Sequence, residues 1–336
     1  MIKKILKITN YFLDFLVFFY DVLLFKIRKK NSRRSYNSFL RYFFLTGGIS
    51  NDIINFFVSK PPKHISLKKG LLSKYDNQSI AKYLEKLKYD GYIILENILT
   101  PSDVDQLIKE FEKKSGFYIS DKNGVSDKQK LDINNPSEVK FFYKSQDVID
   151  EKNFHKILFD PSFINFSQQY LKSYPIIDNV SSWWSFPTTK PDKNAAQLWH
   201  FDLDRPKWLK FFFFMTDCTI ETGAHSFVRG SHKNNGIKWN LRKKGYSRIL
   251  DEEVNNHYDK KDIIQMQAKK GSLLIEDTRG LHKGLRLIKD HRFLIQVQYS
   301  SSTFGTKIER FNFPKTENND YINIKNQFRH TFSLFS

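Results

Sequence analysis

The chain has 336 residues, enough for one large domain with a sizeable core, and its 40% apolar and 27% charged content is typical of a globular protein. The single cysteine, Cys218, excludes an intramolecular disulfide and a thiolate metal cluster, and it favours a reducing, cytoplasmic location. The formal net charge is +19, but the sequence has no helix-turn-helix, zinc-finger or RNP-type pattern, so we expect no nucleic-acid partner.

Most of the positive charge lies near the N-terminus. Residues 1–75 hold fifteen Lys or Arg against three Asp or Glu, which is about +12 of the +19. Residues 11–25 are largely apolar, but Asp14 and Asp21 interrupt them, and the run is too short to span a bilayer. Two interpretations stay open: a helical layer packed on its own domain, which the two aspartates favour, or a helix on the inner face of an anionic membrane.

Residues 1–60 predict two or three helices joined by basic connections. The sequence Lys-Pro-Pro-Lys at residues 60–63 predicts a helix stop or a linker. We therefore expect a basic helical N-terminal extension over residues 1–70 and a main domain over residues 71–336.

The main domain is predicted to begin with a helix, a strand and a second helix. Apolar residues recur at helical spacing between residues 80 and 87, and residues 91–95 predict a strand. The second helix is expected to start at Thr100, because Pro101 suits the first turn and Asp103 stands where a capping box places its acidic residue.

From residue 176 onward, short strand-like runs separated by Gly or polar turns dominate the sequence. Many short strands after a helical N-terminal part predict a β-sandwich or an open barrel with helices on one face. The expected strands are 180–186, 197–201, 209–215, 263–267, 273–276 and 293–299.

Three residues form a candidate metal site. His200 and Asp202 stand two residues apart at the end of the predicted strand 197–201, and side chains at i and i+2 of a strand point to the same face. His282, which follows another predicted strand, is the candidate third ligand. Two histidines and one carboxylate are the ligand set of non-haem Fe(II) oxygenases. His200, Asp202 and His282 are thus the candidate catalytic and metal-binding residues, with Asp204 as a rival carboxylate.

Such a site leaves room for a 2-oxo acid and for O₂. A 2-oxo acid with a second carboxylate needs a cation at its far end. Arg292, ten residues after His282, offers a planar fork that can bind a carboxylate through two hydrogen bonds. Arg286 and Lys289 are rivals, but both fall in the expected connecting loop.

Residues 77 to about 300 resemble the phytanoyl-CoA dioxygenase family. The opening strand and acidic helix are similar to those of the family, and the first two ligands match its H-x-D motif. In two departures from the family pattern, Phe201 stands in the middle of the motif and Gly284 stands where a hydroxyl residue is common. The segments that carry the resemblance are 91–99, His200-Phe201-Asp202, Asp217 with 221–224, Arg229-Gly230-Ser231-His232, His282 and Arg292.

The resemblance implies a mainly β fold with helices, in which residues 71–336 form a double-stranded β-helix (a cupin-like jelly roll) flanked by helices. It implies Fe(2+) as metal, 2-oxoglutarate as co-substrate bound by Arg292, O₂, and stimulation by ascorbate. The expected activity is hydroxylation of a small molecule, because related halogenases lack the carboxylate that Asp202 supplies. The alternative is a non-catalytic jelly-roll binding protein held at a membrane by its basic N-terminus, since fold alone does not decide function.

Three other histidines are expected to stand outside the metal site. His225 is placed in a loop after Gly223 and Ala224, and His232 is interpreted as a structural residue that holds its own turn. His291 adjoins Arg292 but is expected to point the other way.

Overall fold

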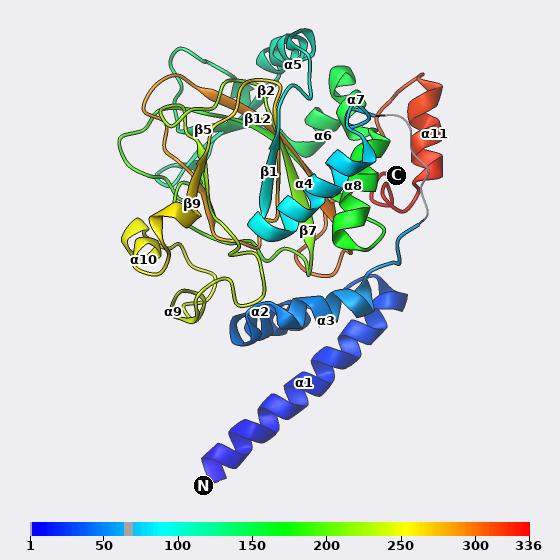
Figure 1. Cartoon of the computed structure of the whole chain (residues 1–336), viewed down its shortest axis with the longest axis vertical. Helices are drawn as coiled ribbons and strands as arrows, with labels where there is room; N and C mark the ends of the chain where they lie inside the picture. The colour runs from blue at the N-terminus through cyan, green and yellow to red at the C-terminus, as the bar shows by residue number, and fades with distance from the viewer. Residues whose placement is uncertain (1, 64–69) are drawn as a thin grey trace.

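The computed structural model describes residues 2–63 and 70–336, with side chains from residue 13 onward. Two antiparallel sheets face each other and form a barrel, helices cover one side of it, and three further helices lie at one end (Figure 1). This architecture is a double-stranded β-helix, or jelly roll, flanked by helices and preceded by a helical segment. The fold class expected from the sequence is confirmed.

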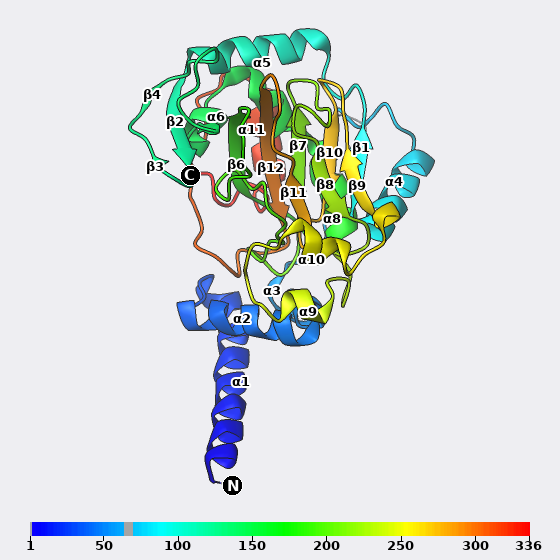
Figure 2. The same cartoon turned by 90° about the vertical axis from the view of Figure 1, so that its left-hand side faces the viewer.

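The N-terminal segment forms three helices: α1 (Ile2–Arg28), α2 (Arg33–Thr46) and α3 (Ile49–Val58). Figure 2 shows α1 extending away from the barrel toward its N-terminus, with α2 and α3 between it and the sheets. The second helix begins at Ser32, whose side chain accepts a hydrogen bond from the Ser35 N–H, as an N-cap does. Within the part of the chain that the structure describes, no helix is both long and apolar enough to cross a membrane.

The main domain carries a helical layer over one face of its large sheet. The helix predicted to start at Thr100 does so, and Thr100 and Asp103 form the expected reciprocal capping box. All helices of the main domain, whether in this layer or elsewhere, are α4 (Asn77–Asp90), α5 (Pro101–Lys113), α6 (Ser145–Ile149), α7 (His155–Leu158), α8 (Pro161–Leu171), α9 (Trp239–Arg242), α10 (Asp251–Asn255) and α11 (Asn319–Gln327), with 3₁₀ turns at Lys152–Phe154 and Lys260–Asp262.

The large sheet runs in the order β1-β10-β7-β12-β6-β5-β2-β3, with β4 paired to β2. Residues of alternate position on β7 and β10, such as Phe211 and Ile275, pack with the helices, while Phe212 and Leu274 face the barrel interior. The strands are β1 (Tyr92–Leu95), β2 (Ser115–Ser120), β3 (Gly124–Val125), β4 (Gln129–Lys130), β5 (Lys140–Phe142), β6 (Ile176–Ser185), β7 (Trp208–Phe214), β10 (Leu273–Glu276) and β12 (Arg292–Ser300).

The small sheet holds β11 (His282–Gly284), β8 (His225–Val228) and β9 (Ile263–Met266), in the order β11-β8-β9. The segment predicted as a strand at 197–201 is not a regular strand, and this prediction was wrong. It forms only isolated bridges, one of them between His200 and His282. Its side chains still alternate, because Phe201 enters the core while His200 faces the barrel interior.

The N-terminal helices share a hydrophobic core with the H-x-D segment of the main domain. Phe43 of α2 lies 5.6 Å from Phe201, measured between ring centroids, and Phe25 of α1 lies 5.3 Å from Phe304. The apolar residue in the middle of the H-x-D motif therefore packs under the extension. The boundary expected at residue 70 adjoins residues 64–69, which lie outside the described residues, so the division into two domains stays a prediction.

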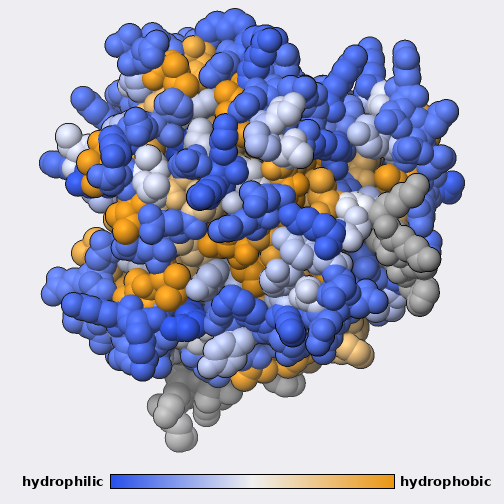
Figure 3. Space-filling view, turned by 45° about the horizontal axis from the view of Figure 1, so that its top comes forward, coloured by the Kyte–Doolittle hydropathy of each residue, from blue (hydrophilic) through white to orange (hydrophobic). Residues whose placement is uncertain are grey.

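The surface of the barrel end turned toward the reader in Figure 3 is mostly hydrophilic, with smaller hydrophobic areas between the polar side chains. Scattered apolar atoms of this kind are ordinary for a folded domain.

Candidate active site

His200, Asp202 and His282 converge at the barrel interior. Their ligand atoms all lie within 4.8 Å of one another, and all three residues are buried. The Nε2 atom of His282 lies 3.6 Å from Oδ2 of Asp202. The backbone bridge between His200 and His282 sets this arrangement, because it holds the two histidines opposite each other across neighbouring segments.

Both histidines are oriented by their own backbone. Nδ1 of His200 donates to the carbonyl of Leu198 at 2.8 Å, and Nδ1 of His282 donates to the carbonyl of Gly280 at 2.9 Å. These bonds fix the tautomer that leaves each Nε2 free as a metal ligand. Burial lowers the pKa of His200 well below its usual range and also lowers that of His282. Both imidazoles are therefore neutral near pH 7, the form that binds metals.

Lys210 on β7 supports the carboxylate of the trio. Its Nζ donates to Oδ2 of Asp202 at 2.6 Å. Burial opposes ionisation of Asp202, but the charge and hydrogen bond of Lys210 counteract it, and the pKa of Asp202 lies below its usual range. Asp202 is thus an anion, although its Oδ2 is shared with a lysine.

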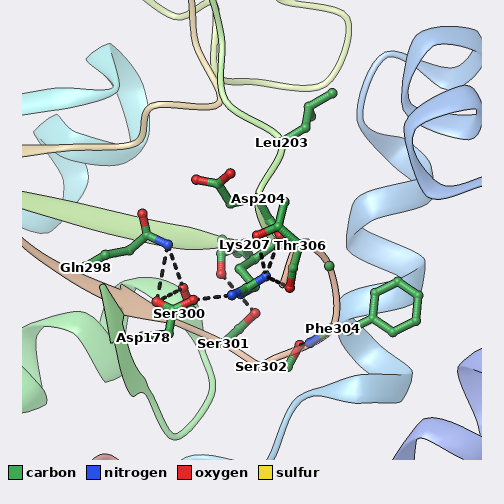
Figure 4. A network of polar contacts seen from close by, with 12 residues as sticks. Asp178, Leu203, Asp204, Lys207, Gln298, Ser300, Ser301, Ser302, Phe304 and Thr306 are labelled. Atoms are coloured by element: carbon green, nitrogen blue, oxygen red, sulfur yellow. Dashed lines mark hydrogen bonds and ion pairs between the residues drawn. The ribbon is translucent and has the colours of Figure 1, made fainter. Parts of the chain in front are cut away.

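A buried ion pair anchors the loop that follows Asp202. Nε of Arg205 donates to Oδ2 of Asp178 at 2.6 Å, and Nη1 donates to the backbone carbonyls of Asp204 and Thr306 at 2.9 and 2.8 Å. Figure 4 shows this network, with Asp178 on one side and Thr306 on the other. Asp204 lies in this loop and is not among the three residues whose ligand atoms converge.

Arg292, at the head of β12, lines the same cavity as the trio. It is buried, and within the described ranges its Nε and Nη1 atoms have no hydrogen-bond partner. Gly223 makes room for it: at φ +86° it lacks a Cβ that would lie 3.0 Å from Nη1 of Arg292 and 2.5 Å from Leu287. Gly284, the second departure from the family pattern, lies beside the guanidinium, and a Cβ there would be in van der Waals contact with Nη2 of Arg292 at 3.5 Å. The rival Arg286 is exposed and donates to the carbonyl of Thr188.

The cavity has a volume of about 310 Å³ and is lined by both polar and apolar residues. Lys140 on β5 enters it, with its ammonium 4.7 Å from the ring centre of Trp183. Burial, together with the charge of Arg292, lowers the pKa of Lys140 to about 8. Asn179, Ser181 and Gln296 complete the polar wall.

Two groups near the trio were missed or misplaced from the sequence. His225, expected in a loop, is the first residue of β8, and its ring lies 5.6 Å from that of His282. Its Nε2 lies 2.9 Å from Oε2 of the fully buried Glu276, although not in line for a hydrogen bond. The loop prediction failed because the strand reaches His225 through pairing with Gly284 of β11 and Met266 of β9, and neither pairing is local in sequence. Lys210 was missed by the sequence analysis. Strand alternation on β7 places it on the same face as Phe212, and this alternation could have identified it as a residue that faces the site.

The donor atoms fit the groups that the sequence predicts. Two neutral imidazoles and one carboxylate on a jelly roll suit a divalent iron. The buried guanidinium of Arg292, which forms no ion pair with an acid of the described residues, suits the distal carboxylate of a 2-oxo acid. Fold and donor set together are those of the jelly-roll class that includes the Fe(II)- and 2-oxoglutarate-dependent oxygenases.

The sequence profile of the phytanoyl-CoA dioxygenase (PhyH) family matches residues 87–287, which is more than half of the chain. The chain belongs to this family of iron- and 2-oxoglutarate-dependent enzymes, and the expected cofactors are those of the family. The match includes His200, Asp202 and His282 and ends before Arg292. No curated protein matches the chain significantly.

Several solved structures are similar at low sequence identity. The epimerase SnoN, in complex with Fe3+, alpha ketoglutarate and nogalamycin RO, is 13% identical with a TM-score of 0.46, over 67% of this chain and 84% of SnoN. HygX from Streptomyces hygroscopicus, with nickel and 2-oxoglutarate bound, is 14% identical with a TM-score of 0.47, over 71% and 92%. The carbocyclase SnoK is 16% identical with a TM-score of 0.45, over 65% and 82%. Similarity this low identifies neither the reaction nor the substrate.

Proposed function

We propose that this chain is an Fe(II)- and 2-oxoglutarate-dependent dioxygenase that hydroxylates a small molecule. The observation that carries the proposal is one cavity lined by His200, Asp202 and His282, whose ligand atoms converge, and by the buried Arg292. When bound, Fe(II) with 2-oxoglutarate and O₂ would supply the oxidising chemistry.

The residues of this chain would bind, orient and shield the reactants. Nε2 of His200, Nε2 of His282 and a carboxylate oxygen of Asp202 would hold the metal, and Arg292 would hold the distal carboxylate of 2-oxoglutarate through two hydrogen bonds. Burial of all four residues keeps bulk water from the reacting centre. The presence of Asp202 supports hydroxylation rather than halogenation.

The polar residues of the cavity wall support a substrate that carries polar groups. Asn179, Ser181 and Gln296 offer hydrogen-bonding groups, and Lys140 offers a cation that has no carboxylate within ion-pair distance in the described part of the chain. About 310 Å³ suits a small molecule or one end of a larger one.

The test is release of succinate from 2-oxoglutarate by the purified protein with Fe(II) and ascorbate under air. We expect turnover that requires all three additions and is lost in a His282→Ala variant but not in a His257→Ala variant, whose histidine lies outside the cavity. Candidate small molecules would then be screened for stimulated succinate release and for incorporation of ¹⁸O from ¹⁸O₂ into the product. Oxidised product without the ¹⁸O label would support the family chemistry but contradict hydroxylation.

A second candidate function is a non-catalytic jelly-roll binding protein attached peripherally to a membrane. The observation that favours it is Lys210, which is bound to the same oxygen of Asp202 that lies nearest to His282. A lysine in this position competes with a metal ion for the carboxylate. Anaerobic equilibrium dialysis with Fe(II) separates the two functions, because the binding protein would retain no iron above the level of a His282→Ala variant.

A further inference from the structure

The outward face of α1 between residues 13 and 25 carries no charged side chain. Phe18 is buried against the main domain, but Phe15 and Leu23 are 48% and 43% exposed. Contact with the main domain therefore leaves most of the apolar side chains of this stretch accessible. The exposed residues of this stretch are all apolar or aromatic: Leu13, Phe15, Leu16, Val17, Phe19, Tyr20 and Leu23.

The two aspartates that interrupt the apolar run face inward. Asp14 forms ion pairs with Arg34 and Arg41 of α2, at 3.4 and 3.1 Å. Asp21 accepts hydrogen bonds from Ser32, at 3.0 Å, and from Ser35. An outward-facing Asp14 or Asp21 would lie at acyl depth in a membrane-bound α1. Residues of α2 and its N-cap bind both aspartates, so neither lies on the exposed apolar face.

The apolar surface continues from α1 onto α3. The ring of Phe19 lies 5.6 Å from that of Phe57, and Phe57 lies 5.4 Å from Phe56. Phe56 is 78% exposed, and Ile53 of the same helix is 54% exposed. Two helices thus present one aromatic-rich surface, in contrast to the mostly hydrophilic barrel end in Figure 3.

Basic residues border this surface where α1 ends and α2 begins. A cleft of about 600 Å³ opens there between the α1–α2 connection and the loop that contains Gly305. Among the described residues, none of those that line it is acidic. The lining includes six cations: Arg28, Lys29, Lys30, Arg33, Lys307 and Arg310.

We propose that α1 and α3 form a membrane-docking surface, in which the exposed apolar residues enter the acyl–headgroup boundary and the basic cleft takes anionic lipid headgroups. An interfacial helix requires both parts, an apolar face and adjacent positive charge. A second copy of the chain fits this surface less well, because a parallel two-fold contact through α1 would bring two basic clusters together. An antiparallel contact would bring each cluster beside the helix start that contains Lys3, Lys4 and Lys7. The proposal does not depend on the oxygenase activity.

The test is flotation of the full-length protein with phosphatidylcholine vesicles that either contain or lack phosphatidylglycerol. One variant combines Phe15→Ser, Phe19→Ser and Leu23→Ser. Its matched control combines Ile220→Ser, Leu250→Ser and Ile288→Ser, which replace similarly exposed apolar residues on the main domain.

A charge variant combines Lys29→Glu, Lys30→Glu and Arg33→Glu, and its control combines Lys122→Glu, Lys243→Glu and Lys315→Glu, which are exposed lysines elsewhere on the surface. Thermal unfolding of each variant checks that it is folded. Light scattering at the same protein concentration reports self-association.

We expect the wild type and both controls to float only with vesicles that contain phosphatidylglycerol. Each basic residue near an anionic surface contributes about fivefold to the partition coefficient, so reversal of three should weaken partitioning by at least about a hundredfold. The apolar variant should weaken it by about tenfold or more. Equal flotation of variants and controls would overturn the proposal, as would a dimer that does not float and that the apolar variant dissociates.

Discussion

Nζ of Lys210 donates a hydrogen bond of 2.6 Å to Oδ2 of Asp202, so one oxygen of the proposed metal-binding carboxylate already has a cationic partner. Both side chains are largely buried, at 14% and 10% exposure. The lysine keeps the carboxylate ionised in the metal-free protein and competes with a metal for the same oxygen.

A Lys210→Met variant should therefore be less stable than the wild type without metal, and added metal should stabilise it more than the wild type. Removing the lysine leaves a buried carboxylate uncompensated, which should lower the free energy of unfolding by about 3 kcal/mol or more. Added Mn(II) should stabilise the variant more than the wild type. Urea denaturation with EDTA and with Mn(II) measures both effects, and Lys207→Met, at a half-buried lysine over Tyr170, is the control. Equal stabilisation by Mn(II) would show that Lys210 and the metal do not compete.

Separate substitution of Asp202 and Asp204 should show which of the two aspartates binds the metal. Asp202→Ala should reduce Fe(II) affinity and succinate release by more than about a hundredfold. Loss of a residue that only hydrogen-bonds to a metal ligand already lowers metal affinity or activity by about 10- to 100-fold, and loss of the ligand itself should cost more. Asp204→Ala should leave Fe(II) affinity within about tenfold, since its carboxylate lies outside the converging set. Equilibrium dialysis and turnover assays measure the two effects, and the reverse ranking would make Asp204 the ligand.

Arg292→Ala should raise the KM for 2-oxoglutarate. Loss of a charge-assisted pair costs about 2–3 kcal/mol, or about 30- to 150-fold. Arg286→Ala replaces an exposed arginine of the adjacent loop and should leave this KM unchanged. Steady-state kinetics with varied 2-oxoglutarate checks the prediction, and an equal rise in the KM for the prime substrate would mean that Arg292 acts through the shape of the cavity.

The Arg205–Asp178 pair should be important for the position of the H-x-D loop. Arg205→Met leaves Asp178 buried without its cation and should lower the free energy of unfolding by about 3–5 kcal/mol. Arg229→Met breaks a half-exposed pair with Asp262 and should cost no more than about 1 kcal/mol. Denaturation curves of both variants give the comparison. Similar losses in the two would show that the buried pair has no special role.

His232 should make the metal-free protein less stable in mild acid. Burial lowers the pKa of His232 to about 4, whereas an unfolded histidine titrates near 6.5, so the unfolded state binds more protons between these values. Stability should fall as pH falls through this window, and at pH 5 His232 alone should account for a loss of about 2 kcal/mol relative to pH 7. His232→Gln should flatten the curve of unfolding free energy against pH by that amount. An unchanged slope would contradict the burial argument.

Much of the fold follows from local patterns. Thr100, Pro101 and Asp103 predicted a helix start that the structure contains, because a capping box satisfies its own backbone groups without help from the rest of the chain. The alternation at His200, Phe201 and Asp202 predicted which side chains share a face, although no regular strand forms there. Local conformation was enough to orient the three side chains.

Other features depended on contacts between segments far apart in the sequence. His225 joins a strand because β8 pairs with β11 and β9, and Lys210 reaches Asp202 because β7 lies beside the H-x-D segment. Neither pairing has a local signal, since the partners are recognised by shape and burial.

The sequence by itself determined the composition of the candidate site: two histidines, one aspartate and an arginine in an order typical of the family. It also determined that the N-terminal helices would be basic and aromatic. The tertiary structure decided which way these groups face. Asp14 and Asp21 turn toward α2, where Arg34, Arg41 and two serines satisfy them, and the opposite face of α1 is left apolar. Helix periodicity places residues on faces, but the direction of each face depends on which partners bury it.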